Sequence, residues 1–596
     1  MTRITASTLW DRVCSGGRSE FMVTPGQRFT YADLEQGVRR WLNCFDAAGL
    51  RPGDRMVMRT RHEPAMVSGF IAALLDGIVP VLLAADTPDL RVQAIHAKVD
   101  AACLVLDEGA AGQCLSHARA VQLAEAGPAK RGLFRRAEPA DAFSHLRSGA
   151  ATRAPRLPSG RSELGYILFT SGTTASPSGV MISQGNLYAN LETLTRLFGY
   201  QQQSRIFNDM LLAHADGMVQ GPLLALASGC AVIRAGGFTI PTTEEWLNRI
   251  RAERATHVIT VPTVWAMIDA YARFDDYFDA PECRLLLSVA AKLPDELWRR
   301  LEKRFGRPVC NQYGLTETVA SALYAGPLAE MGGFGTIGLP VDCEARIDPL
   351  SPDRQEGELQ LRGENIFPGY WQDEERTKSA FTADGWLKTG DLVRQRADGP
   401  FEYLSRLKSV IMMGGFLIRP DEIDEAMLAH PAVRESVTVA IEDEMFGEVP
   451  VTGVVCSEPV GENDLTEHAR TRLEARKVPK RIIALAEIPR GLSGKPTLAQ
   501  LTTALMAAVG PHARVGEGEQ VLDDAVLAIA ARVFRVAADQ LTLDSGVGDV
   551  PGWDSFSHLN FLFEIETHFS VSISAARFAA IRSIRDMTRA VRESRT

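Results

Sequence analysis

The sequence lacks paired cysteines, a signal-peptide core and an excess of basic residues. Its nine cysteines are scattered from Cys14 to Cys456 without a C-x-x-C motif, which excludes zinc-ribbon and thioredoxin-type sites. Scattered single thiols predict a reducing, cytoplasmic setting. The opening residues MTRITASTLWDRVC contain no apolar core of the signal-peptide kind. The formal net charge of -10 argues against a nucleic-acid or anionic-membrane partner, because both require basic surface.

One apolar run, from Met66 to Ala85, is long enough to raise the question of a membrane span. Asp76, Gly77 and Pro80 interrupt it near its middle, so we predict a buried helix followed by a buried strand, and no membrane span. Similar apolar runs alternate with helical patterns over most of the chain: DRMVMRT, ACLVLDE, GYILFT, CAVIRA and THVITV. Continuous apolar strands of this kind predict parallel sheets covered on both faces, in an α/β fold.

The composition and pattern of the sequence change at two points after this α/β region. Beyond residue 404, a strand, a Gly-Gly turn, a second strand and a helix predict a smaller α+β unit. The stretch 509–520 is dominated by Gly, Pro and charge, as in a linker. The residues after it suffice for a small helical domain. There, Leu522, Val526, Ile529 and Val533 share one predicted helical face, and Phe556, Leu559 and Phe563 share another.

The stretch FTSGTTASPSG, residues 169–179, has the composition of a phosphate-binding loop without a cation. Backbone N–H groups and the hydroxyls of Thr170, Ser171, Thr173 and Thr174 could hold phosphate oxygens. The Walker pattern G-x-x-x-x-G-K-[ST] is absent. By itself, such a Ser/Thr/Gly cluster is most often an ordinary loop.

Four further blocks follow this loop in order. They are NQYGLTET, GYWQDEERTKSAFTADGWLKTGDL, SRLKSVIMMGGFLIRPDEID and IPRGLSGKP. Together the five blocks resemble the acyl-adenylate-forming superfamily, which includes acyl- and aryl-CoA synthetases, luciferases and adenylation domains of nonribosomal peptide synthetases. The resemblance covers roughly residues 5 to 505. It implies an acid–thiol ligase that uses ATP and Mg²⁺.

The resemblance assigns roles to individual residues. Lys495 matches the lysine that bridges the carboxylate and the α-phosphate, and Glu317 matches the Mg²⁺-binding glutamate. His214, in LLAHADG, would lie beside the carboxylate of the acid. Lys408 falls at the hinge about which the small domain pivots between half-reactions. The residues implied in ATP or AMP binding are Thr170, Ser171, Gly172, Thr173, Thr174, Ala291, Tyr313, Gly314, Thr316, Asp391 and Arg406.

The chain departs from the family pattern at four places, one of which is Ser405, where the family has the glycine before Arg406. The loop, close to TSGTTGxPKG in the family, has Ala175 for a glycine and Ser178 for the lysine. It is therefore expected to hold the β- and γ-phosphates without that extra charge. Ala215 stands where amino-acid-activating relatives place an aspartate, and Asp216 follows one residue later. A shifted alignment would keep an amino-acid substrate open.

The last domain carries a second resemblance. The stretch GWDSFSHLNFLFEIETHFSVSIS is similar to an acyl- or peptidyl-carrier protein around its DSL site. Ser555 would then carry 4′-phosphopantetheine, added by a phosphopantetheinyl transferase. Glu564 and Glu566 are expected to add the acidic surface that such partners recognise.

These resemblances imply three domains in sequence. An α/β adenylating core (1–404) is followed by a mobile α+β subdomain (405–508), a linker (509–520) and an all-α, four-helix-type carrier domain (521–596). The expected function is activation of a small carboxylic acid as acyl-AMP and its transfer to the chain's own carrier, for a downstream enzyme of a thiotemplate pathway. An amino-acid-activating didomain and a non-catalytic carrier scaffold loaded in trans are the alternatives.

Overall fold

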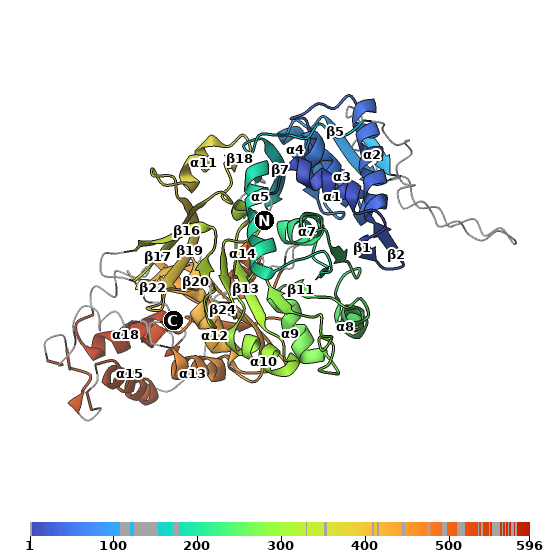
Figure 1. Cartoon of the computed structure of the whole chain (residues 1–596). Helices are drawn as coiled ribbons and strands as arrows, with labels where there is room; N and C mark the ends of the chain where they lie inside the picture. The colour runs from blue at the N-terminus through green and yellow to red at the C-terminus, as the bar shows by residue number, and fades with distance from the viewer. Residues whose placement is uncertain are drawn as a thin grey trace. The chain divides into compact units, whose positions relative to one another are not determined.

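Two compact units make up the computed structural model of the chain (Figure 1). The first consists of Met1–Thr389 and Val393–Tyr403, and the second of Gly390–Leu392 and Leu404–Thr596. The structure describes residues 3–107, 120–123, 153–170, 178–328, 331–350, 355–407, 410–413, 416–443, 447–473, 477–490, 498–508, 519–534 and 581–595, with scattered positions between 535 and 580.

A nine-stranded sheet forms the larger part of the first unit. In spatial order its strands are β15 (Leu339–Pro340), β14 (Leu323–Ala325), β13 (Val309–Tyr313), β12 (Leu285–Ser288), β11 (His257–Thr260), β9 (Arg205–Asn208), β10 (Ala231–Ile233), β1 (Glu20–Thr24) and β2 (Gln27–Thr30). The strands from β13 to β1 run parallel, and β2, β14 and β15 pair antiparallel at the edges. The carboxyl ends of the inner strands therefore meet at one edge of the sheet.

A second, seven-stranded sheet lies in the same unit. Its order is β18 (Gly369–Tyr370), β8 (Ser178–Ser183), β7 (Leu164–Thr170), β4 (Val79–Leu83), β3 (Arg55–Arg59), β5 (Cys103–Asp107) and β6 (Ala120–Leu123). The strands from β7 to β6 run parallel, whereas β8 and β18 are antiparallel additions. All five apolar runs predicted as buried parallel strands are confirmed, as β3, β5, β7, β10 and β11.

Helices cover both sheets, and a smaller sheet completes the unit. The helices are α1 (Ala6–Ser15), α2 (Tyr31–Ala47), α3 (Glu63–Asp76), α4 (Asp89–Lys98), α5 (Gln184–Phe198), α6 (Ala215–Met218), α7 (Leu224–Ser228), α8 (Thr243–Ala252), α9 (Pro262–Tyr271), α10 (Asp295–Phe305) and α11 (Glu374–Ala380). The four-stranded sheet has the order β16 (Cys343–Pro349), β17 (Glu356–Gly363), β19 (Leu387–Gln395) and β20 (Phe401–Arg406), of which residues 390–392 and 404–406 are counted in the second unit.

The apolar run from Met66 to Ala85 forms the predicted helix and strand. Helix α3 ends at Gly77, whose φ of 75° is the left-handed conformation that glycine adopts without strain, and β4 follows. Every residue of β4 is buried. Among the helices that the structure describes, none combines the length and the apolar character of a bilayer span.

The second unit contains the predicted α+β fold. Its sheet has the order β22 (Phe416–Ile418), β21 (Ile411–Met413), β24 (Gly447–Cys456) and β23 (Val433–Asp443), and β25 (Arg481–Ala484) pairs with β24. The helices are α12 (Pro420–Leu428), α13 (Glu462–Arg472) and α14 (Leu498–Ala508).

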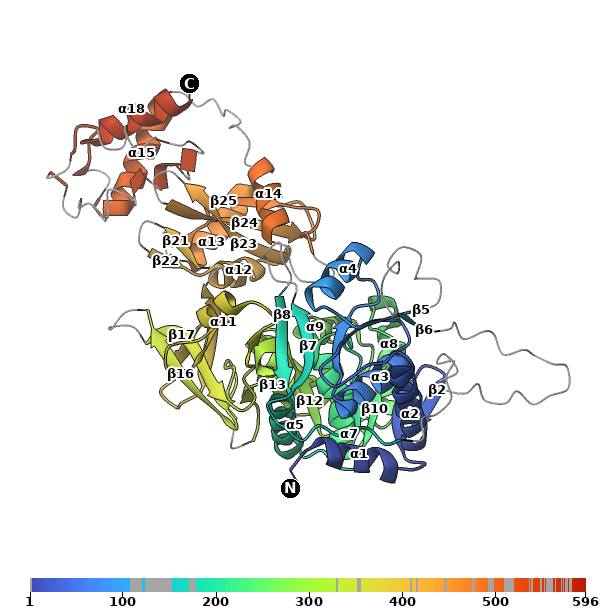
Figure 2. The ribbon, with the colours of Figure 1, turned by 90° about the horizontal axis from the view of Figure 1, so that it is seen from above.

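The carrier region contributes α15 (Glu519–Phe534) and α18 (Ile584–Arg595), which lie side by side (Figure 2). Leu522, Val526 and Ile529 on α15 are buried, as their shared face predicts, and Val533 is partly buried. The second predicted face, of Phe556, Leu559 and Phe563, lies outside the described residues. The predicted fold class is confirmed throughout.

Asp424, on α12, makes the stability of the second unit depend on pH. Burial raises the pKa of this carboxyl from 3.8 to about 6, although its Oδ1 accepts hydrogen bonds from Ser436 Oγ and Thr438 Oγ1, both at 2.8 Å. The folded state thus holds the proton more tightly than the unfolded state. The contribution of Asp424 to stability is therefore complete below about pH 4 and is lost as pH rises through 6.

We expect Asp424→Asn to remove this dependence, because the amide keeps the acceptor oxygen and does not ionise. Above pH 7 the variant should unfold at a higher temperature than the wild type, and its free energy of unfolding should be higher by up to about 3 kcal/mol. Below pH 4.5 this difference should vanish. Thermal unfolding of the full chain from pH 4 to 8 measures this. A difference between the two proteins that stays constant over the whole range would contradict the prediction.

Candidate functional site

The predicted nucleotide residues of the first unit follow the carboxyl ends of parallel strands. Tyr313 is the last residue of β13, Ala291 comes shortly after β12, and His214 lies in the loop after β9. These strands belong to one run of the nine-stranded sheet, in the order β13, β12, β11 and β9. Ligands of open α/β sheets bind at this edge, so residues far apart in sequence gather at one place.

The turn after β13 is folded so tightly that it requires Gly314. A Cβ added there would lie 1.9 Å from the backbone oxygen of Ala320, which any side chain would displace. Thr318 closes the turn, because its Oγ1 donates to the Leu315 oxygen and accepts from the Leu315 N–H, both at 2.9 Å. Val319 has a φ of 69°, which is strained for a β-branched residue. Such strain is concentrated at functional sites.

Glu317 lies on this turn, in the 3₁₀ helix Thr316–Thr318. The hydroxyl of Tyr370 donates a hydrogen bond of 2.8 Å to Glu317 Oε1, and the Phe367 N–H donates one of 2.9 Å to the Glu317 backbone oxygen. Burial, together with the Glu317 carboxylate, raises the pKa of Tyr370 well above its ordinary range. The tyrosine therefore stays a hydrogen-bond donor and fixes the carboxylate.

His214 caps α6 and faces Asp216. Its Nδ1 accepts a hydrogen bond of 3.3 Å from the Asp216 N–H and lies 3.3 Å from Asp216 Oδ2. Asp216 is 5% exposed, and its Oδ1 accepts a hydrogen bond of 2.8 Å from Gln220 Nε2. Helix α6 continues directly into a π-helix, Val219–Leu223, a form that is frequent at functional sites.

Asp391 and Arg406, both of the second unit, form an ion pair. Arg406 Nε lies 2.9 Å from Asp391 Oδ1, and the aspartate side chain is buried while that of the arginine is half exposed. The structure thus brings together two residues that the sequence assigns to the nucleotide. A buried carboxylate next to an exposed guanidinium suits the two hydroxyls of a ribose.

Several predicted site residues lie outside the described part of the chain. They are Ser171, Gly172, Thr173, Thr174, Ala175, Lys408, Lys495 and Ser555. Thr170 is placed as the last residue of β7, where it pairs with Ser178 of β8. This pairing closes the base of the loop 171–177.

Sequence reasoning missed Tyr370 and Arg376 as site residues. Both belong to the block GYWQDEERTK, which served only to establish the resemblance. In the structure, Tyr370 binds Glu317, and Arg376 NH1 donates a hydrogen bond to Ser178 Oγ. No local pattern marks these contacts, because each joins residues distant in the chain.

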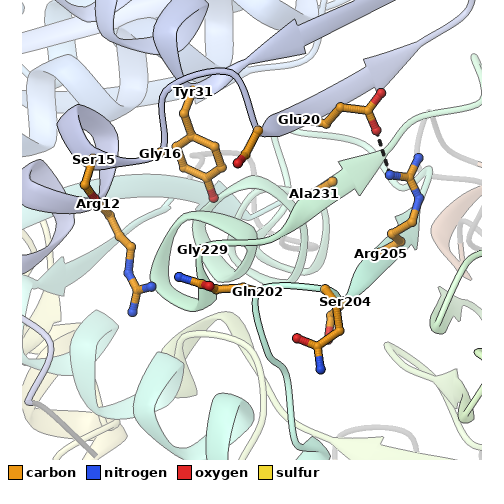
Figure 3. A pocket seen from close by; sticks show the side chains of 12 residues that line it. Arg12, Ser15, Gly16, Glu20, Tyr31, Gln202, Ser204, Arg205, Gly229 and Ala231 are labelled. Carbon is orange, nitrogen blue, oxygen red and sulfur yellow. Dashed lines mark hydrogen bonds and ion pairs between the residues drawn. The ribbon is translucent and has the colours of Figure 1, made fainter.

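A polar cavity of about 450 Å³ lies at the opposite end of the same sheet (Figure 3). Its lining includes the first residues of three parallel strands, Glu20, Arg205 and Ala231. Arg205 NH1 and Glu20 Oε2 are 2.6 Å apart, so these two charges neutralise each other. None of the residues predicted for the nucleotide lines this cavity, and the candidate site is therefore at the carboxyl edge.

The prediction that Glu564 and Glu566 form an acidic recognition surface on the carrier region is wrong. Glu564 and Glu566 are 6% and 3% exposed. Glu564 Oε2 accepts a hydrogen bond of 2.7 Å from Arg532, and Glu566 Oε1 accepts one of 2.6 Å from the Ile573 N–H. Both carboxylates are used inside the second unit, where Arg470 lies 3.8 Å from Glu564 and Lys480 lies 3.4 Å from Glu566, because a buried charge requires a partner.

Three family models match the chain in order. The model described as "AMP-binding enzyme" matches residues 11–371, and "AMP-binding enzyme C-terminal domain" matches residues 422–495. The model described as "Phosphopantetheine attachment site" matches residues 524–591.

Curated relatives include CoA ligases. A sulfoacetate–CoA ligase of Cupriavidus necator is 37% identical over 55% of this chain, which spans 65% of that relative's length. A feruloyl-CoA synthase of an Amycolatopsis species is 30% identical over 79% of this chain and 92% of its own.

Solved structures share the fold. ATP-bound MatB from Rhodopseudomonas palustris has a TM-score of 0.74 at 25% identity, and covers 84% of this chain and 99% of its own. The o-succinylbenzoate CoA synthetase MenE from Bacillus subtilis, in complex with its acyl-adenylate intermediate, has a TM-score of 0.72 at 23% identity, over 87% of this chain and 100% of its own.

We expect Tyr370→Phe to destabilise the first unit by about 1.5–3 kcal/mol, because it removes a hydrogen bond to a charged group. Tyr166→Phe is the matched control. The hydroxyl of Tyr166 is buried and has no hydrogen-bond partner among the residues that the structure describes, so its loss should cost nothing. Thermal unfolding of both variants checks this, and equal effects would show that the bond to Glu317 does not stabilise the turn.

Proposed function

This chain belongs to the AMP-binding enzyme family, and we propose that it is an acid–thiol ligase that activates a small carboxylic acid as acyl-AMP and loads it onto its own carrier domain. The observation that carries the proposal is the phosphopantetheine attachment match, residues 524–591, on the same chain as both adenylating matches. A tethered thiol reaches an effective concentration in the mM range for a flexible linker, so free CoA is not required.

The first half-reaction joins two anions. A carboxylate oxygen of the acid attacks the α-phosphorus of ATP, the bond to the β-phosphate oxygen breaks, and pyrophosphate leaves. Charge must be neutralised between the reactants, and Lys495 is the residue proposed to bridge the carboxylate and the α-phosphate.

Glu317 is the proposed ligand of Mg²⁺. The described residues contain no cluster of three or more metal-ligating side chains. A single carboxylate nevertheless fits Mg²⁺, which is usually held by one or two carboxylates together with phosphates and water. The hydrogen bond from Tyr370 orients this carboxylate. When bound, Mg²⁺ supplies charge neutralisation on the phosphates.

The nucleotide is proposed to be held by the residues that the family resemblance assigns to it. The ring of Tyr313 covers adenine, with Ala291, Gly314 and Thr316 in contact with the nucleotide, and Asp391 accepts hydrogen bonds from the ribose hydroxyls. Arg406, its ion-pair partner, contacts the nucleotide as well. Lys408 is the proposed hinge between the two half-reactions.

The second half-reaction requires a thiol. Phosphopantetheine, attached to Ser555, supplies it; the sulfur attacks the acyl carbon of acyl-AMP, and AMP leaves. This assignment rests on the motif around Ser555 and on the family match, which includes that residue.

A non-amino acid is the favoured substrate. Asp216, the candidate partner of an amino group, is buried and already engaged by Gln220 and His214. The relatives include CoA ligases named for sulfoacetate, oxalate, malonate and 2-succinylbenzoate, and a feruloyl-CoA synthase, which suggests a test panel of short acids with a second acidic group and of aryl acids. An amino-acid substrate and a catalytically inactive scaffold, suggested by Ala175 and Ser178, are the alternatives.

The biological setting is part of the proposal. A carrier domain requires a phosphopantetheinyl transferase, and a loaded carrier requires a downstream enzyme of a thiotemplate pathway. None of the eight cysteines in the described residues is in a disulfide, which supports a reducing, cytoplasmic compartment. Intact-protein mass spectrometry of the pantetheinylated chain, with ATP, Mg²⁺ and the acid panel, tests the function. A mass gain with an acid supports it, and no gain and no pyrophosphate exchange with any acid would establish the scaffold.

Lys495→Ala should nearly abolish adenylate formation and spare the transfer of a supplied acyl-AMP to the carrier. Loss of an electrostatic stabiliser of this kind costs about 3–4 kcal/mol, or roughly 10²–10³-fold in rate. Pyrophosphate exchange measures the first step, and carrier acylation from synthetic acyl-AMP measures the second. Equal losses in both steps would contradict the proposed role.

Ser555→Ala should abolish acyl loading and leave acid-dependent pyrophosphate exchange unchanged. The exchange needs only the nucleotide site, whose proposed residues all precede the linker 509–520. Acylation that persists in the variant, seen by intact mass, would place the acceptor on another residue.

A further inference from the structure

Ser178 stands where the family pattern has a lysine, and an arginine from another part of the first unit contacts it. We propose that Arg376 supplies the missing cation and binds the β- and γ-phosphates of ATP. This inference rests on the proposed function, because it assigns the anion as ATP. It names a binding residue that the sequence motifs do not mark.

The contact that places Arg376 at the loop is made with Ser178. Arg376 NH1 donates a hydrogen bond to Ser178 Oγ, across 198 residues of sequence. Ser178 is the first residue of β8, is 5% exposed, and pairs with Thr170 at the end of β7. The guanidinium therefore lies where the two strands that carry the loop come together, at the position where the family has its lysine.

The arginine is held there by its surroundings. Its backbone N–H donates a hydrogen bond of 3.1 Å to Asp373 Oδ1, which caps α11. The guanidinium carbon lies 4.3 Å from the centroid of the Tyr370 ring, a cation–π distance. The same Tyr370 donates its hydroxyl to Glu317. One aromatic ring thus joins the cation of the loop to the proposed Mg²⁺ ligand.

The charge of Arg376 is not neutralised by a carboxylate among the described residues. Arg346 provides the contrast, because it stacks on Trp386 at 4.4 Å and also forms an ion pair of 2.7 Å with Asp384. Arg376 has the stacking contact without the ion pair. A half-buried guanidinium with N–H donors to spare, beside the end of β7 and the start of β8, fits a phosphate.

The proposed contacts of Arg376 are with the two terminal phosphates of ATP and not with the rest of the nucleotide. The loop is assigned to the β- and γ-phosphates, whereas Tyr313, at the carboxyl end of β13, is assigned to adenine. AMP lacks the two terminal phosphates. Removal of the Arg376 charge should therefore weaken the binding of ATP and leave the binding of AMP unchanged.

The test measures the dissociation constants of Mg²⁺–ATP and of AMP by titration calorimetry with the full chain, in the absence of acid. We expect Arg376→Gln to weaken ATP binding about 10- to 100-fold, the usual effect of losing hydrogen bonds to a charged group, and to leave AMP binding unchanged. Arg376→Lys should retain most of the ATP affinity. Arg346→Gln, the matched control, should bind both nucleotides like the wild type.

A second test uses the variant Ser178→Lys. In the wild-type background the new ammonium would lie against the Arg376 guanidinium and should not improve ATP binding. In the Arg376→Gln background it restores the family lysine, and ATP affinity should return. Failure of this rescue would count against a requirement for charge at the loop.

The inference is overturned if Arg376→Gln binds ATP like the wild type, or if it loses ATP and AMP equally, which would make Arg376 a structural support only. A different outcome would contradict the proposed function alone. If the wild type binds ATP through Arg376 and no acid supports pyrophosphate exchange, the inference stands and the ligase activity does not. A wild-type chain that binds no ATP would refute both.

Discussion

The hydrogen bond between the Tyr370 hydroxyl and the Glu317 carboxylate is the contact on which the first unit's site depends. Tyr370 belongs to the seven-stranded sheet, and Glu317 follows the last inner strand of the nine-stranded sheet. The bond therefore links a strand of one sheet to the turn that follows a strand of the other sheet. Because Tyr370 also stacks under Arg376, a displacement of its ring would move both a cation and a carboxylate. The strained turn at Val319 persists only because its surroundings hold it.

Charge balance explains how the chain is organised around that contact. A reaction between a carboxylate and a polyphosphate needs cations at several points, yet the chain is acidic overall. Many bases of the described residues are paired with carboxylates, as in the ion pair of Arg346 with Asp384. The proposed anion sites are divided between the units, with Arg376 in the first and Arg406 in the second.

In the carrier region, two acidic side chains are likewise paired with partners inside the fold. Glu564 and Glu566 read as acidic surface in the sequence, but they are buried and bonded to Arg532 and to a backbone N–H. Their helix also buries Phe561, Leu562 and Ile565, so its faces are decided by packing. Carboxylates between such residues must find partners within the fold. Recognition by a partner protein would therefore depend on other residues of this domain.

The sequence by itself determined the fold class, the strands and the order of the domains. Apolar runs such as 55–59 and 257–260 are local signals, and a parallel sheet buries them whatever its neighbours are. The motif NQYGLTET likewise kept Tyr313 and Glu317 close together, because adjacency along the chain survives folding. Only the tertiary structure decided that Arg376 meets Ser178 and that the Tyr370 hydroxyl donates to Glu317. Such contacts join single side chains through the packing of separate elements, so they leave no periodic pattern in the sequence.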